Sequence, residues 1–168
     1  MNTVHLSTAY FPPIQYFAKL LQYPAATLEV CENFPKQTYR NRCHILGSNG
    51  KIALSIPVKK ANKKTPITEV EIDYAEDWQK QHSRALLAAY GSSPFYEYYI
   101  HDFDFVFKGK TQTLCELNHK ILVVCCELLQ ITPELMNTQE FHKHYPNDFR
   151  NTIHPKKKNQ QLDPNFTP

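Results

Sequence analysis

The feature that most restricts the fold of this chain is a β-hairpin signature in residues 33–60. A period-2 pattern, typical of a half-buried strand, is formed by Ile52, Leu54, Ile56 and Val58. This strand follows Ser48-Asn49-Gly50, in which Asn-Gly tolerates the positive φ angles of a tight turn. We therefore predict that residues 42–46 form the partner strand and pair with it in the antiparallel direction.

Cations stand at both ends of the predicted hairpin. Arg40 and Arg42 lie at its start, and Lys59 and Lys60 follow it. Guanidinium groups bind phosphate and carboxylate through bidentate, charge-assisted hydrogen bonds. The pattern therefore favours an anionic ligand, and a nucleotide-sugar diphosphate would fit. The alternative is a solvated basic turn in which one arginine pairs with a structural carboxylate.

The rest of the chain predicts short strands and helices in alternation. Alternating apolar residues predict strands at 3–7, 27–32 and 67–73. Helical spacing with cap residues predicts helices between Pro12 and Pro24 and at 76–90, 94–107 and 113–129. The last of these has the most regular apolar face, so we expect it to be the central core helix. A short helix is also predicted to begin at Thr132.

These elements predict an α+β (mixed α/β) fold in which about four helices cover a small, mostly antiparallel sheet. A chain of 168 residues is most simply one globular domain, and we place that domain at residues 1–146. From 147 to 168 the composition shifts to Pro, Asn, Lys and Gln, which predicts a polar loop or tail.

Composition argues against several classes of protein. The formal charge of +3 is too small to favour nucleic acid as a partner. The four glycines lack the spacing of a phosphate-cradling loop. Five cysteines without C-x-x-C spacing favour reduced, buried thiols over a disulfide scaffold. With no apolar run of transmembrane length and no signal peptide, we expect no membrane insertion and a cytoplasmic location.

An ordered set of short motifs between Leu6 and Ile131 resembles the WbqC-like family. In sequence order these motifs are Tyr10-Phe11-Pro12, Arg40-Asn41-Arg42, the LSIPVK segment at 54–59, the Ile-x-x-Val-x-Ile-Asp segment at 67–73, Trp78 with His82, Ala89-Tyr90, and the Ser-Pro-Phe-Tyr-x-Tyr segment at 93–98. Each motif alone is weak, and their common order is what makes the resemblance specific.

The resemblance implies a role in the biosynthesis of bacterial surface polysaccharide, such as the O-antigen of lipopolysaccharide. For members of this family a glycine transferase, placing an aminoacyl group on a sugar, has been suggested. Two departures stand out. Members commonly have His-Gln-Pro where this chain has Leu6, Ser7 and Thr8. The chain also ends where many similar proteins continue into another aromatic segment, so we expect a shortened version.

The candidate site follows from these observations. His82 is the candidate general base, because the unperturbed pKa of histidine, ~6.5, suits proton transfer at neutral pH. The alternative is that His82 has no catalytic role and is a surface or capping histidine. The expected substrate is a small molecule, an activated sugar or an aminoacyl donor. The predicted substrate-binding residues are Tyr10, Arg40, Asn41, Arg42, Lys59 and Tyr90.

Other readings of the same residues stay open. Cys31 and Cys43 are possible nucleophiles, but core packing is the commoner role of such thiols. His142 and His144 alone make too weak a ligand set, so we predict no metal site and no cofactor. The alternative function is a non-catalytic protein that binds an anionic ligand or assists assembly. A third and weaker hypothesis is RNA binding, which would be strongly salt-dependent.

Overall fold

The computed structural model describes residues 2–62, 64–156, 163 and 166. The strands and longer helices are, in chain order, β1 (Thr3–Ser7), α1 (Ile14–Gln22), β2 (Ala25–Glu29), β3 (Arg42–Gly47), β4 (Gly50–Ser55), α2 (Trp78–Tyr90), α3 (Tyr96–Ile100), α4 (Asp104–Phe107), α5 (Leu114–Leu128) and β5 (Glu134–Asn137). Single 3-10 turns lie at η1 (Ile67–Glu69) and η2 (His101–Phe103).

The larger sheet is parallel, which corrects the prediction of a mostly antiparallel sheet. Its strand order is β1-β2-β5, with Thr3 beside Ala25 and Ala25 beside Glu134. The helix α1 joins β1 to β2, and a helical crossover of this kind returns the chain in the same direction. The antiparallel pair β3-β4 forms a separate sheet. The fold is therefore α+β with mainly parallel pairing.

The outer edge of β1 pairs with residues 147–149, which the sequence places at the start of a polar tail. The backbone N–H of His5 donates to the carbonyl of Asn147 (3.0 Å), and that of Phe149 donates to the carbonyl of His5 (2.9 Å). A little farther on, Ile153 is buried against the sheet. This early part of the segment therefore contributes to the core, whereas residues 157–162 of the predicted tail lie outside the described residues.

The predicted hairpin is confirmed. β3 and β4 pair antiparallel, and Gly47 faces Gly50 across a two-residue turn. Gly50 has a φ of +108°, a conformation that L side chains rarely adopt, so the turn requires glycine there. Leu54 and Ile56 are buried as the alternation predicts, while Ile52, close to the turn, is exposed.

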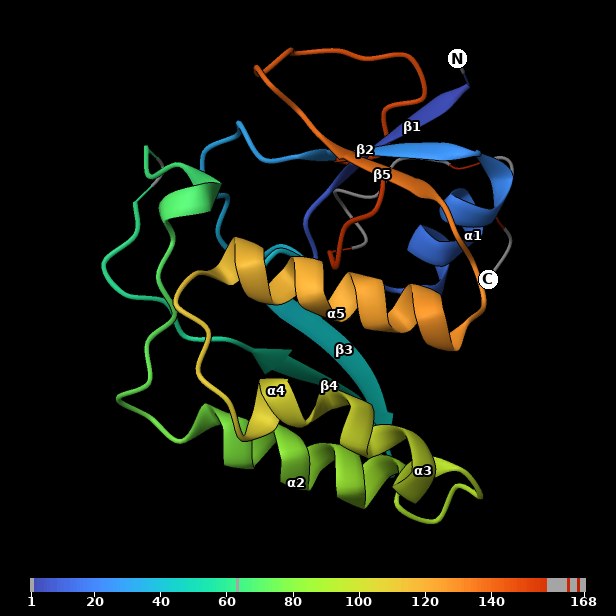
Figure 1. The fold of residues 1–168 in the computed structure, drawn as a ribbon. Helices are drawn as coiled ribbons and strands as arrows, with labels where there is room; N and C mark the ends of the chain where they lie inside the picture. Colours follow the sequence, from blue (N-terminus) through green and yellow to red (C-terminus); the bar gives the residue numbers. More distant parts are fainter. Residues whose placement is uncertain (1, 63, 157–162, 164–165, 167–168) are drawn as a thin grey trace.

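The helix α5 lies between two hydrophobic cores, as its regular apolar face predicts. Leu122 and Cys126 pack with β1, β2 and α1 on one side. Leu114, Leu117 and Ile121 pack with the hairpin and α2 on the other. Figure 1 shows this layering, with the parallel sheet above α5 and the hairpin and α2 below it. We call the two sides the sheet half (β1, β2, β5, α1 and residues 147–153) and the hairpin half (β3, β4 and α2 to α4).

Three local predictions are wrong, each because tertiary contacts override the local pattern. The stretch 67–73 contains the 3-10 turn η1 instead of a continuous strand, although Ile67, Val70 and Ile72 are still buried. The single helix expected at 94–107 is divided into α3, η2 and α4. The helix expected from Thr132 is replaced by β5, which fills the edge of the sheet beside β2.

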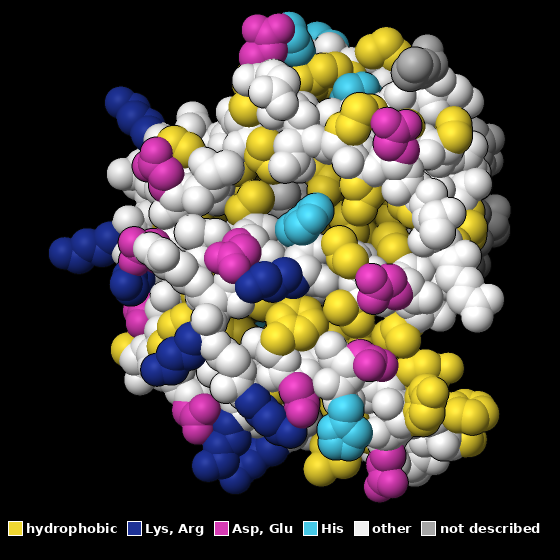
Figure 2. All heavy atoms as spheres, in the orientation of Figure 1, with side chains coloured by type: hydrophobic (Ala, Val, Ile, Leu, Met, Phe, Trp, Pro, Cys, Tyr) yellow, Lys and Arg dark blue, Asp and Glu magenta, His cyan; other side chains and the backbone are white. Residues whose placement is uncertain are grey.

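The two ends of the hairpin half differ in surface character. In the view of Figure 2, Lys and Arg side chains gather on the left and lower left, and hydrophobic side chains gather at the lower right, over α3. Phe95 and Tyr98 near α3 are largely exposed. Within the part of the chain that the structure describes, no helix is both long and apolar enough to cross a membrane.

Candidate functional site

A pocket of about 330 Å³ beside the hairpin gathers three of the predicted binding residues. We call it the hairpin pocket, and it is lined by Phe34, Lys36, Gln37, Asn41, Arg42, Val58, Lys59, Lys60 and Ala61. Two backbone-directed bonds extend the hairpin to this point. The N–H of Ile56 donates to the carbonyl of Asn41 (2.8 Å), and the side-chain amide of Asn41 donates to the carbonyl of Ile56 (3.0 Å). The basic turn and the segment after β4 are thereby held side by side.

The hairpin pocket is positively charged. Its described lining includes the cations Lys36, Arg42, Lys59 and Lys60, and no Asp or Glu. Lys59 donates to Glu71 (2.6 Å), and this hydrogen bond raises the pKa of the Lys59 ammonium. Both partners are exposed, so water screens the pair strongly.

Arg42 keeps its charge available to the hairpin pocket. Its Nε donates to the hydroxyl of Ser55 (2.8 Å), a neutral partner that fixes the side chain without cancelling its charge. Lys156 also reaches this region, where its Nζ contacts Oε1 of Gln37. The arrangement can bind a phosphate or carboxylate through several charge-assisted hydrogen bonds.

Asn41 lines the hairpin pocket and carries an unsatisfied hydrogen-bond acceptor. Its Oδ1 is buried and has no partner among the described residues. Because its Nδ2 is held by Ile56, the orientation of the amide is set and Oδ1 remains the free atom. Buried polar atoms in native proteins are nearly always satisfied, so a ligand hydroxyl or ordered water is the expected partner.

A larger groove of about 800 Å³ adjoins the hairpin pocket, and Lys36 lines both. We call it the tail groove; its lining comes from the segment after β2 and from residues 141–154. Its charged and titratable lining side chains are Cys31, Glu32, Lys36, Arg40, Lys143, Arg150 and His154. Burial is the main cause that lowers the pKa of His154; a backbone hydrogen bond with Lys156 opposes it, and the charges of Arg40 and Lys156 add to the lowering.

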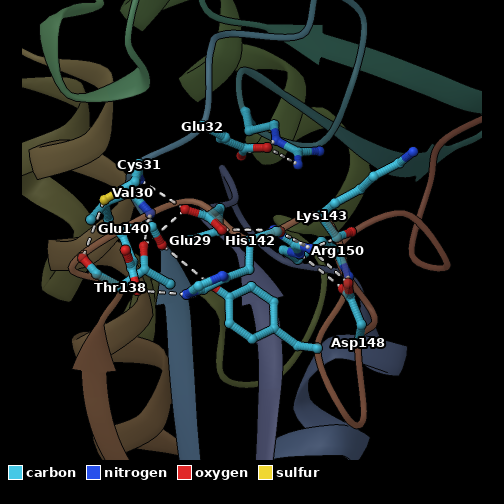
Figure 3. A network of polar contacts seen from close by, with 12 residues as sticks. Glu29, Val30, Cys31, Glu32, Thr138, Glu140, His142, Lys143, Asp148 and Arg150 are labelled. Atoms are coloured by element: carbon cyan, nitrogen blue, oxygen red, sulfur yellow. Dashed lines mark hydrogen bonds and ion pairs between the residues drawn. The ribbon is translucent and has the colours of Figure 1, made fainter.

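Beneath the tail groove lies a buried network of charges, drawn in Figure 3. Arg150 donates from Nη1 to Glu29 (2.7 Å) and from Nε and Nη2 to Asp148 (2.9 and 2.7 Å). The hydroxyl of Thr138 also donates to Glu29 (2.8 Å). Desolvation opposes ionisation of Asp148, but the hydrogen bonds from Arg150 outweigh it and lower the pKa of this carboxyl. This network of hydrogen bonds and ion pairs joins β2, the segment after β5 and residues 148–150, so its role is structural.

Arg40 has the structural role that the sequence left open as an alternative. Its Nε and Nη2 donate to the two carboxylate oxygens of Glu32, each at 2.8 Å, and only 3% of the residue is exposed. Its carbonyl accepts a hydrogen bond from Asn118 (2.7 Å). The charge of Arg40 is therefore neutralised by Glu32, whereas Arg42, two residues on, lines the hairpin pocket.

The hairpin pocket is not lined by His82, Tyr10 or Tyr90. The hydroxyl of Tyr10 is 2.9 Å from Nδ1 of His82, and both residues are buried in the hairpin-half core. Burial lowers the pKa of His82 to about 4, against a smaller opposing effect of a backbone hydrogen bond with Ser55. The hydroxyl of Tyr90 accepts from the N–H of Leu46 in β3 (3.1 Å). The structure thus places these three residues in packing and hairpin support.

The site also contains residues that the predicted set omits. Lys36 and Lys60 line the hairpin pocket, and both belong to the basic segments already visible around the hairpin. Arg150 lines the tail groove, but its partner Glu29 is 121 positions away, and no local pattern signals that pairing. The described residues contain no cluster of three or more His, Cys, Asp or Glu side chains suited to a metal ion.

Comparison with known proteins gives one match. The chain matches the model of the WbqC-like protein family over residues 8–160. No curated protein and no solved structure matches it.

Proposed function

The chain belongs to the WbqC-like protein family, and from this premise we propose that it is a transferase of bacterial surface-polysaccharide biosynthesis that binds an activated, anionic donor in the hairpin pocket. The group to be transferred is a sugar or a glycyl group. The observation that carries this proposal is the charge of the pocket, whose described lining holds four cations and no carboxylate.

The pocket supplies the two kinds of contact that such a donor needs. Arg42, Lys59 and Lys60 offer donors to phosphate or carboxylate oxygens. Asn41 offers a buried acceptor to a hydroxyl of the same molecule. A volume of about 330 Å³ lies at the lower end of the range of typical ligand pockets, so it accommodates part of a nucleotide sugar, with the remainder in the adjoining tail groove.

One observation favours the non-catalytic alternative. The described lining of the hairpin pocket contains no His, Asp or Glu that could act as a general base. His82, the base that the sequence suggests, is buried beside Tyr10 in the core. A protein with this pocket binds and presents an anionic molecule, and a partner protein then supplies the chemistry.

Binding is tested by calorimetric titration with inorganic pyrophosphate and with UDP-glucose. We expect Arg42→Ala to weaken binding about tenfold, the effect of losing one charge-assisted contact. Lys51→Ala is the matched control, because it removes the same charge from an exposed position of β4 that does not line the pocket. Failure of folded wild-type protein to bind either compound, or equal weakening by both substitutions, would overturn the proposal.

Turnover separates the two functions. Wild-type protein is incubated with UDP-glucose or a glycyl donor and a sugar acceptor, and the transferred product is measured by mass spectrometry. Product that disappears in Arg42→Ala supports a transferase. If the protein binds these donors but forms no product with any of them, the result supports the non-catalytic alternative.

A further inference from the structure

A separate cavity of about 220 Å³ lies at the carboxyl ends of the parallel strands. Thr8 follows β1, Val30 follows β2 and Asn137 ends β5, and all three line the cavity. Tyr16 of α1 and Leu122 of α5 also line it. We call it the sheet-edge cavity. It shares no lining residue with the hairpin pocket. In open sheets with parallel strands, ligands bind outside the carboxyl ends of the strands.

Asn118 lines this cavity and carries an unsatisfied hydrogen-bond acceptor. Only 1% of the residue is exposed, and its Oδ1 has no partner in the described part of the chain. Its Nδ2 donates to the carbonyl of Arg40 (2.7 Å) and to the hydroxyl of Thr8 (3.3 Å). A carbonyl accepts and never donates, so the bond to Arg40 requires nitrogen on that side and leaves oxygen as the free atom.

The remaining lining determines what kind of group fits. Tyr16 and Leu122 give the cavity apolar walls, while Asn118 and Thr8 give it a small buried polar region. Glu116 and His119 also line the cavity, but both are exposed, and Glu116 is paired with Lys120 (2.7 Å). The described lining contains no Lys or Arg, which distinguishes it from the hairpin pocket. Cys115 also lines the cavity, but burial and then the charge of Glu32 raise the pKa of its thiol. The thiol therefore stays protonated near neutral pH and is a wall of the site, not a nucleophile.

We infer that the sheet-edge cavity is a second binding site, which takes a small uncharged group with one apolar face and an N–H or O–H donor directed at Oδ1 of Asn118. A sugar ring and an aminoacyl amide share this chemistry. The volume of the cavity is below the ~300 Å³ of pockets that hold drug-sized ligands, so one such group fits and a nucleotide does not. This site stands on its own residues and does not depend on the hairpin pocket.

The test uses two neutral probes, methyl β-D-glucopyranoside and N-acetylglycinamide, with full-length protein. Ligands of this size are expected to bind with a Kd of about 1 mM. Binding is followed by NMR, with intermolecular NOEs from the probe to the methyl groups of Val30 and Leu122. The probe that gives these NOEs identifies the group as a sugar or an aminoacyl amide, and either result supports the site.

Two variants give the expected contrast. Val30→Phe fills the cavity from its partly exposed rim and is expected to weaken probe binding at least about tenfold while leaving pyrophosphate binding unchanged. Arg42→Ala should weaken pyrophosphate binding and leave probe binding unchanged. If Val30→Phe does not fold, the wild-type NOEs to Val30 and Leu122 still show whether a probe binds in the cavity. The absence of NOEs from both probes to folded wild-type protein at ~10 mM, about ten times the expected Kd, overturns the inference. Failure of pyrophosphate alone to bind affects only the hairpin pocket.

Discussion

The two cores on either side of α5 differ in the polar groups that they bury: one buries ion pairs, and the other buries a neutral pair. In the sheet half, charged side chains are buried in ion pairs: Arg150 with Glu29, and Lys19 with Asp163 (2.8 Å); the half-buried Asp148 also binds Arg150. In the hairpin half, the buried polar pair is the neutral Tyr10–His82 contact. The cations of the hairpin half lie at its rim instead, where Arg42 and Lys60 line a pocket.

This difference separates cations that hold the fold from cations that can bind a ligand. A buried cation that is already paired with carboxylates cannot accept a new anion without losing its structural partner. A half-buried cation with a neutral partner, such as Arg42, can accept one. Arg40 and Arg42 show the distinction within two residues, because one is paired with Glu32 and the other with a serine hydroxyl.

The largest effect is expected when the buried network of the sheet half is broken. Arg150→Ala leaves Glu29, which is fully buried, without its ion-pair partner, and should lower the free energy of unfolding by about 3–5 kcal/mol. Urea denaturation measures this change. The double variant Glu29→Gln/Arg150→Ala removes both charges and should lose less stability than the sum of the losses of Glu29→Gln and Arg150→Ala. Strict additivity would mean that the pair is not coupled, which would remove the contrast between the halves.

The next effect concerns the neutral histidine of the hairpin half. The unfolded chain protonates His82 below about pH 6.5, whereas the folded protein keeps it neutral down to a pKa of about 4. The unfolded state therefore binds more protons than the folded state between pH 6.5 and 4. As the pH is lowered through this window, the free energy of unfolding falls by about 3 kcal/mol. Below pH 4 both states are protonated and this contribution stays constant.

The measurement for His82 is the pH dependence of unfolding in wild type and His82→Gln. The variant should lose much of the slope between pH 4 and 6.5. Other histidines with lowered pKa values, such as His5 and His44, are present in both proteins and cancel in the difference. Parallel curves for the two proteins would show that His82 is protonated in the folded state.

A smaller effect distinguishes the neighbouring arginines. Arg40→Ala should destabilise the protein by about 2 kcal/mol, because it removes a bidentate pair with a carboxylate that remains 12% exposed and can be rehydrated. Arg42→Ala should change the free energy of unfolding by less than about 0.5 kcal/mol. Thermal and urea unfolding compare the two. Equal destabilisation would contradict the division of roles between them.

The smallest effect is expected at the exposed pair Lys59–Glu71. Glu71→Gln should leave the melting temperature unchanged within error, because water screens the pair. It should strengthen pyrophosphate binding by about twofold, since Lys59 loses a competing anion. Calorimetry at low salt measures this change. A marked loss of stability would instead assign Lys59 a structural role like that of Arg40.

Sequence reasoning located the elements whose signals are local. The hairpin follows from Asn49-Gly50 and an alternating strand, and α5 follows from its regular apolar face. Both are decided by residues within a few turns of one another, so a single sequence contains the needed information.

What the sequence did not contain is the pairing of distant segments. β2 lies between β1 and β5, and β5 is more than 100 positions farther along the chain. The four residues of β5 carry no alternation, and Thr132-Pro133-Glu134 at their start is typical of the start of a helix. The candidate site divides in the same way. The basic segments beside the hairpin are visible in the sequence, whereas His82 is buried against Tyr10, 72 positions away, and the carbonyl of Arg40 is bound by Asn118, 78 positions away.

The pairing of β1 with residues 147–149 has a consequence for how the protein forms in the cell. A ribosome synthesises β1 before residues 147–149, which pair with its outer edge, and before β5, which lies on the far side of β2. The hairpin and α2 can associate while the chain is still growing. The sheet half must wait until its last segments leave the exit tunnel, and until then the β1 edge is exposed to other chains.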